Sequence, residues 1–312
     1  MKKGCLYFVL ALVALLLLFT AFIALQGRKT PSGNPEYVAL GSSFAAGAGL
    51  GKLQEGSPLM CARSVNGYPQ QLARLLKMSI VDMSCGGATA KHVLGGGQFF
   101  QGPQLRVIDK RTRFVTITVG GNDVGYIGDL SMLAARHTNS LFGRLVRASW
   151  NGPKPINERG FPGLEADLSS TLQAIHRRAP NATVVVATYP TIMPSAGTCP
   201  VLGLNSDEVQ MMRLVAGRLA ETTKAAAKRG GAIVVDMNKL GAAHNACAVE
   251  PWARGWLNGG VAPFHPTLEG AKATSEAIAE ALKKSPAGVT AVGQHNATRH
   301  QTSGIGREKQ HH

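Results

Sequence analysis

The chain has 312 residues, which is enough for one well-buried domain of about 250 residues with short appendages at both ends. With 33 Lys and Arg against 18 Asp and Glu, its formal net charge of +15 favours anionic partners such as acidic lipids or polyanionic glycans. No basic block is interleaved with aromatic residues, so nucleic acid is not an expected partner.

The first predicted element is an apolar helix. The 20 residues from Leu6 to Leu25 carry no charge, and as a helix they would span roughly 30 Å, one hydrocarbon core. A cleaved signal peptide is the alternative, but Phe22 or Leu25 would then occupy the −3 position, where small residues are usual. We therefore favour an uncleaved membrane anchor in residues 1–30. Either interpretation places the following domain outside the cytoplasm, in the periplasm or at the cell surface.

Strands alternate with helices from residue 37 to residue 284. Apolar and β-branched runs predict strands at 37–40, 80–83, 114–119, 183–187 and 233–236, and amphipathic runs predict helices at 68–77, 162–178, 206–229 and 267–284. This order predicts an α/β fold with three α/β/α layers and a doubly wound parallel sheet of five strands. Residues 124–160 are expected to be an irregular insertion, a lid or a substrate-binding segment.

Residues 31–284 are therefore expected to form one domain, and the polar residues 285–312 a disordered tail. The expected domain contains four cysteines, Cys61, Cys85, Cys199 and Cys247. An even number in an exported domain suggests disulfides, and of the three possible pairings we favour Cys61 with Cys85 and Cys199 with Cys247. Zinc is the alternative, but neither C-x-x-C nor H-x-x-x-H spacing occurs, so no metal is expected.

Three short motifs follow the first three predicted strands, and a fourth precedes the last helix. They are Gly41-Ser42-Ser43, Cys85-Gly86-Gly87-Ala88-Thr89, Gly120-Gly121-Asn122-Asp123 and Phe264-His265-Pro266. The carboxyl ends of parallel strands lie along one edge of the sheet, so these motifs are expected to meet there. Serine, glycine, asparagine and histidine would then supply a nucleophile, oxyanion donors and a base.

These four blocks, in this order, resemble those of the SGNH (GDSL-like) hydrolase superfamily, over about residues 36–284. The resemblance implies a flavodoxin-like fold and ester hydrolysis without a cofactor. It assigns the nucleophile to Ser43 and the base to His265. It assigns the oxyanion hole to the main-chain N–H groups of Ser43 and Gly87 and the side-chain amide of Asn122.

Two positions depart from the family pattern. Ser42 stands where the family usually has an aspartate, and Ala262 stands where an aspartate usually orients the histidine. We expect instead a dyad in which the main-chain carbonyl of Ala262 holds the Nδ1–H of His265. A remote acid, Asp236 or Glu250, is the alternative.

The sequence therefore predicts an exported serine esterase that hydrolyses acyl or acetyl esters of lipids or glycans through an acyl-enzyme on Ser43. It resembles secreted bacterial esterases and lipases. The aromatic stretch from Phe142 to Trp150 is expected to bind acyl chains or sugars, or to fill the core. Two alternatives stay open. One is a cell-envelope glycan O-acyltransferase of the same fold, and the other is a non-catalytic envelope-binding domain.

Overall fold

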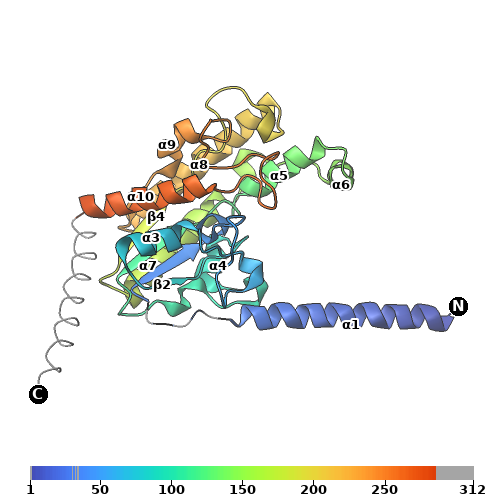
Figure 1. The fold of residues 1–312 in the computed structure, drawn as a ribbon, viewed down its shortest axis with the longest axis horizontal. Helices are drawn as coiled ribbons and strands as arrows, with labels where there is room; N and C mark the ends of the chain where they lie inside the picture. The colour runs from blue at the N-terminus through green and yellow to red at the C-terminus, as the bar shows by residue number, and fades with distance from the viewer. Residues whose placement is uncertain (1, 30, 32, 34, 286–312) are drawn as a thin grey trace, which may run out of the picture.

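Five parallel strands form the centre of the molecule, in the order β2-β1-β3-β4-β5 (Figure 1). The computed structural model describes residues 2–285 except 30, 32 and 34. The strands are β1 (Tyr37–Gly41), β2 (Ile80–Asp82), β3 (Phe114–Thr118), β4 (Thr183–Ala187) and β5 (Ile233–Val235). The predicted parallel, doubly wound sheet is confirmed, and each strand ends within one residue of its expected bounds.

Helices cover both faces of this sheet. The helices of the domain are α2 (Ser43–Ala46), α3 (Tyr68–Leu76), α4 (Ala90–Gly95), α5 (Tyr126–Arg136), α6 (Leu141–Ser149), α7 (Phe161–Arg178), α8 (Ser206–Arg229), α9 (Met237–Leu240) and α10 (Leu268–Lys284). Successive strand residues point to opposite faces, which divides the core in two. Val38 and Leu40 face the core under α4, α5, α7 and α8, whereas Tyr37 and Ala39 face the core under α3 and α10.

The prediction that residues 124–160 are irregular is wrong, because this segment contains α5 and α6. Leu130 and Leu133 are buried at helical spacing and attach α5 to the core. The helix α6 begins at an N-cap, where the Ser140 hydroxyl accepts a hydrogen bond from the Gly143 N–H at 3.0 Å. The helix α4 was also not expected. At six residues it is too short to show a clear period, and Thr89 caps it.

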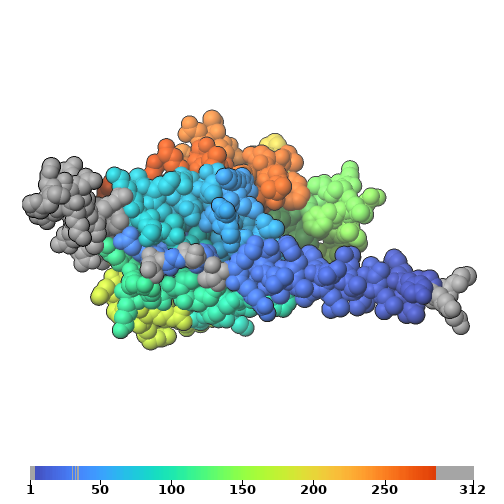
Figure 2. All heavy atoms as spheres, turned by 60° about the horizontal axis from the view of Figure 1, so that its bottom comes forward, coloured from blue at the N-terminus to red at the C-terminus, as the bar shows by residue number. Residues whose placement is uncertain are grey.

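The N-terminal helix α1 (Lys2–Gly27) leaves the domain as a long rod (Figures 1 and 2). It is the one helix in the described part of the chain that is long and apolar enough to cross a membrane, over Gly4–Gly27. Its C-terminal end contacts the body, where Gly27 lies against the 3₁₀ turn η2 (Gln98–Phe100) and the helix also contacts the 3₁₀ turn η1 (Leu59–Cys61). A Cβ on Gly27 would come within 2.1 Å of the Phe99 carbonyl oxygen. The predicted tail lies outside the described residues, apart from Ser285.

Candidate active site

The turn after β1 positions Ser43. Gly41 has φ +138°, and a Cβ there would lie 2.2 Å from the Thr118 carbonyl oxygen, so glycine is required. The side chain of Gln104 fixes Gly41 from both sides, accepting from its N–H at 2.8 Å and donating to its carbonyl at 3.0 Å. Ser43 then begins α2, so its N–H has no acceptor within the helix. The residue is 8% exposed and therefore mostly buried.

The histidine of the fourth motif reaches this hydroxyl. His265 comes from the loop before α10, and its Nε2 lies 2.8 Å from Ser43 Oγ. Its Nδ1 lies 2.8 Å from the carbonyl oxygen of Pro263. A carbonyl oxygen only accepts, so Nδ1 carries the hydrogen and Nε2 accepts from the Ser43 hydroxyl. The neutral ring is therefore held in the tautomer that a general base needs.

The acceptor for Nδ1 is Pro263, so the prediction of the Ala262 carbonyl is wrong by one residue. Phe264 has φ +59°, a left-handed backbone conformation, and the turn it makes brings the Pro263 carbonyl beside the ring. The remote acids are used elsewhere. Asp236 accepts from Lys224 Nζ at 2.8 Å, and Glu250 lies exposed on the surface. Within the described residues, no carboxylate bonds to His265.

The surroundings of His265 favour its neutral form. Burial lowers the pKa of the imidazole, the hydrogen bond to Pro263 raises this pKa, and the nearby positive charge of Arg254 lowers it. The net pKa of His265 is below its ordinary value, so the ring is neutral and able to accept a proton at neutral pH.

Two further motif residues lie at the same edge of the sheet. Gly87 has φ +78° and is exposed, and its N–H makes no hydrogen bond within the described part of the chain. The amide of Asn122 donates to the Ala88 carbonyl at 2.9 Å, which ties it to the Gly87 loop, and its second N–H has no acceptor among the described residues. The Cys85 N–H donates to the Gly41 carbonyl at 3.0 Å and ties the same loop to the Ser43 turn.

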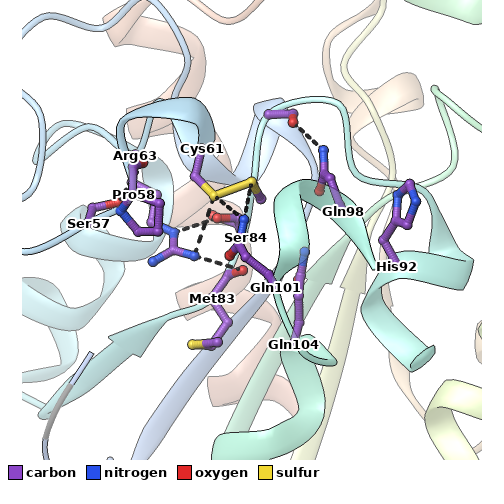
Figure 3. The surroundings of a disulfide bond; sticks show 12 residues. Ser57, Pro58, Cys61, Arg63, Met83, Ser84, His92, Gln98, Gln101 and Gln104 are labelled. Atoms are coloured by element: carbon purple, nitrogen blue, oxygen red, sulfur yellow. Dashed lines mark hydrogen bonds between the residues drawn. A yellow bond between two sulfur atoms is a disulfide. The ribbon is translucent and has the colours of Figure 1, made fainter. Parts of the chain in front are cut away.

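A disulfide begins the loop that leads to Gly87, and Figure 3 shows this bond at Cys61 with Gln98 and Gln101 beside it. The structure pairs Cys61 with Cys85 and Cys199 with Cys247, as expected. The Gly86 N–H donates to the Cys61 carbonyl at 2.9 Å, and Gln98 Nε2 donates to the Gly86 carbonyl at 2.7 Å. The loop that carries the Gly87 N–H is therefore fixed on both sides of its glycines.

The motifs did not reveal Tyr189, which partners Ser42. The two hydroxyl oxygens lie 2.7 Å apart, and Tyr189 Oη accepts from the Gly121 N–H at 3.1 Å. Burial raises the pKa of Tyr189 to about 12, so the phenol stays protonated and able to donate. Tyr189 follows the predicted strand 183–187, and its place at the carboxyl end of a strand was the signal that could have found it.

A cleft of about 370 Å³ begins at Asn122 and Asp123 and is lined on its other side by the insertion. Trp150, Lys154 and Arg159 contribute to this wall. Phe142 does not line the cleft and is 52% exposed on α6. The insertion therefore forms part of a cleft beside the candidate oxyanion hole, through Trp150 rather than through the whole aromatic stretch.

Comparison with known proteins agrees with this geometry. Residues 39–273 match the model of the GDSL-like Lipase/Acylhydrolase family. A lipase from Streptomyces rimosus is 30% identical over 267 residues, covering 83% of this chain and 93% of the relative, and Lipase 1 from Streptomyces coelicolor is 29% identical over 262 residues, covering 81% and 91%.

Two crystal structures support the same conclusion. An extracellular lipase from S. rimosus has a TM-score of 0.63 at 29% identity, covering 78% of this chain and 98% of that one. Phospholipase A1 from Streptomyces albidoflavus has a TM-score of 0.62 at 26% identity, covering 78% and 97%. The chain therefore belongs to the GDSL-like lipase/acylhydrolase family of the SGNH hydrolase superfamily, and it is a carboxylic ester hydrolase.

Proposed function

We propose that this hydrolase cleaves lipid esters outside the cytoplasm through an acyl-enzyme on Ser43, while α1 anchors it in a membrane. The observation that supports the proposal most directly is the contact of Ser43 Oγ with His265 Nε2 at 2.8 Å. The Nδ1 of the same ring donates to the Pro263 carbonyl, so Nε2 is free to accept the proton. A serine hydroxyl is a weak nucleophile until an adjacent base takes its proton, and this geometry provides that base.

In the first half of the reaction, Ser43 Oγ forms a bond to the ester carbonyl carbon while its proton passes to Nε2 of His265. The carbonyl oxygen becomes an oxyanion. The N–H groups of Ser43 and Gly87 and the amide of Asn122 are the donors that would stabilise it, each by a few kcal/mol. The C–O bond to the alcohol then breaks, and the alcohol leaves with the proton from Nε2.

In the second half, water attacks the acyl carbon and gives its proton to the same nitrogen. The Ser43–acyl bond breaks, the carboxylic acid is released, and the proton returns to Ser43. The imidazolium that forms twice in this cycle is stabilised by the Pro263 carbonyl and not by a carboxylate. A carbonyl fixes the tautomer but stabilises positive charge less than a carboxylate does.

The preference for lipid esters rests on the relatives. Those that cover about four-fifths of this chain at 26–30% identity are named as lipases or a phospholipase A1. Location outside the cytoplasm is supported by the two disulfides, which persist in oxidising compartments. Membrane anchoring is supported by the length and apolar composition of α1 and by its exposed surface.

The test combines a fluorophosphonate probe with a series of p-nitrophenyl esters of rising chain length. We expect the probe to label Ser43, and Ser43→Ala to abolish labelling and to lower kcat by a factor of about 10³ or more without unfolding. Longer acyl chains should be hydrolysed with higher kcat/KM than acetate. Full activity without labelling at Ser43 would contradict the mechanism. A product esterified on an added sugar would favour acyl transfer.

A further inference from the structure

The helix α6 has an apolar side that the described part of the chain leaves uncovered. Leu141, Phe142 and Leu145 have exposed fractions of 67%, 52% and 55%. Leu141 and Leu145 lie one helical turn apart, and Phe142 lies beside them. An adjoining side of α6 attaches it to the body, where Gly143 and Val146 are buried. We call Leu141, Phe142 and Leu145 the α6 patch.

Positive charge accompanies the α6 patch. No Asp or Glu occurs in the sequence between Asp129 and Glu158, while Arg144 and Arg147 are exposed on α6 itself. One nitrogen of Arg147 donates to the Thr138 carbonyl at 2.7 Å, which holds this side chain beside the helix. A helix with exposed apolar side chains and neighbouring arginines suits a membrane interface. The apolar side chains enter the boundary of the acyl chains, and the arginines contact anionic headgroups.

The direction of α1 brings this side of the domain toward the membrane. Figures 1 and 2 are related by a turn about the horizontal axis, and in both α6 lies at the end of the body toward which α1 projects. The last turn of α1 is fixed to the body by the contact of Gly27 with η2. A bilayer that holds α1 therefore faces α6, whereas Figure 1 places α9 away from the free end of α1.

We propose that the α6 patch enters the outer surface of the membrane that holds α1, so that the domain rests on the bilayer at two points. The inference rests on the proposed function in one respect, the retention of α1 as an anchor. Trp150 follows α6 directly and lines the cleft that begins at Asn122. Docking of α6 therefore places the mouth of this cleft at the lipid surface, where esters of the same membrane enter it.

Depth-dependent quenching tests the docking without reference to catalysis. In a Cys5→Ser background of the full chain, which removes the free cysteine, Leu145→Cys carries a bimane label. Leu240→Cys on α9 is the matched control, because Leu240 is 52% exposed and Leu145 is 55% exposed. Both proteins are reconstituted into vesicles of phosphatidylcholine and phosphatidylglycerol, with or without doxyl groups on the acyl chains, and intact mass verifies that α1 is present.

We expect doxyl lipids to quench the label at position 145 at least about threefold more than the label at position 240. Equal quenching at the two positions overturns the proposal. Blue-shifted emission at 145 without quenching also overturns it, since a second copy of the chain would then cover the α6 patch. Removal of α1 when the chain is exported overturns it as well, because nothing then orients α6 on the bilayer.

A kinetic experiment separates this proposal from the proposed function. Leu145→Glu should lower hydrolysis of an ester embedded in vesicles by about fivefold, because a carboxylate opposes entry into an apolar and anionic interface. Hydrolysis of water-soluble p-nitrophenyl acetate should stay within about twofold of the wild type, and Leu240→Glu should change neither rate. Unchanged vesicle activity in Leu145→Glu contradicts the docking. If the wild-type protein does not hydrolyse p-nitrophenyl acetate, that result contradicts the proposed catalytic function instead.

Discussion

The ring of His265 lies between a hydroxyl and a main-chain carbonyl, with a positive charge nearby and no acid bonded to it among the described residues. This arrangement has a cost and a benefit. The imidazolium that the proposed mechanism forms on His265 is less stabilised by a carbonyl than it would be by a carboxylate. The pKa of His265 is lowered by burial and by Arg254, so the base stays neutral, and therefore active, at lower pH than an ordinary histidine.

The first residue-scale prediction concerns the acid limb of the pH profile. In the proposed mechanism neutral His265 is the active form, so kcat/KM is expected to fall as pH drops through its lowered pKa. Arg254→Gln removes a charge that lowers this pKa, so the acid limb should move to higher pH. The measurement is kcat/KM for p-nitrophenyl acetate from about pH 4 to about pH 9. Arg254→Lys keeps the charge and should keep the wild-type limb. An acid limb at the same pH in Arg254→Gln as in the wild type would show that the charge of Arg254 does not lower the pKa of His265.

Asp123 provides the second residue-scale prediction. Its carboxylate accepts from the Ala90 N–H at 3.0 Å, in the first turn of α4. Burial raises the pKa of Asp123 to about 6. A raised pKa in the folded state means that stability is present at low pH and lost as pH rises from the unfolded value to about 6.

Asp123→Asn keeps an acceptor for Ala90 but cannot ionise. We expect the variant to be more stable than the wild type above pH 6 by about 2 kcal/mol, allowing for partial solvent access, and equally stable near pH 4. Urea unfolding at several pH values measures the difference. If the wild type and the variant lose stability in parallel between these pH values, a group other than Asp123 causes the pH dependence of the unfolding free energy.

At the scale of elements, the two disulfides hold different parts of the molecule. Cys61–Cys85 closes 24 residues, and the Cys61 carbonyl accepts from the Gly86 N–H in the Gly86–Gly87 loop. Cys199–Cys247 closes 48 residues and contains no residue of the Gly86–Gly87 loop. In the chain-entropy model each contributes roughly 3–4 kcal/mol. Their contributions to stability are thus similar, while only the first positions a proposed oxyanion donor.

Replacing each pair by serine separates the two effects. Cys61→Ser/Cys85→Ser and Cys199→Ser/Cys247→Ser should each destabilise the protein by roughly 3–4 kcal/mol. Only the first double variant should also lower kcat on a short ester, by about tenfold or more, because the Gly87 N–H is then less precisely placed. Thermal unfolding and steady-state kinetics measure the two quantities. Equal losses of kcat in both variants would argue against a special role for the first disulfide.

At the scale of the whole molecule, the domain and α1 meet over a small area. Side chains along most of α1 are exposed, from Leu6 at 56% to Phe22 at 43%, and its C-terminal end contacts the two short 3₁₀ turns η1 and η2. The sheet, its two cores and the Ser43–His265 contact are all built from residues from Tyr37 onward. The domain is therefore expected to fold without its N-terminal helix.

Deletion of residues 1–29 tests this independence. We expect the midpoint of thermal unfolding to change by no more than a few degrees, because a small surface contact is worth less than about 1 kcal/mol. Hydrolysis of p-nitrophenyl acetate should stay within about twofold, and the protein should move from the membrane pellet to the supernatant. A large drop in the unfolding midpoint would mean that α1 is a part of the folded core.

Local pattern was sufficient for the five strands, because β-branched runs bounded by glycine motifs are short and strongly marked. It failed for α4 and for the insertion. The helix α4 is a capped segment of about one and a half turns and is too short to show a period. The helices α5 and α6 do carry apolar residues at helical spacing, as at Leu130 and Leu133, and the prediction missed them inside a segment rich in Gly, Asn and Ser. The helix predicted at 267–284 is confirmed as α10, which Thr267 caps by accepting from the Gly270 N–H at 3.0 Å.

The sequence by itself determined the order of strands and helices, the candidate pair Ser43 and His265, and the apolar N-terminal helix. Each of these features depends on a short run of neighbouring residues. Tertiary structure alone decided that Pro263 rather than Ala262 holds the ring, and that Tyr189 completes the support of Ser42. Both depend on where a carbonyl or a hydroxyl points after the backbone turns. Such directions come from left-handed turns and from contacts between strands more than a hundred residues apart, which local pattern does not encode.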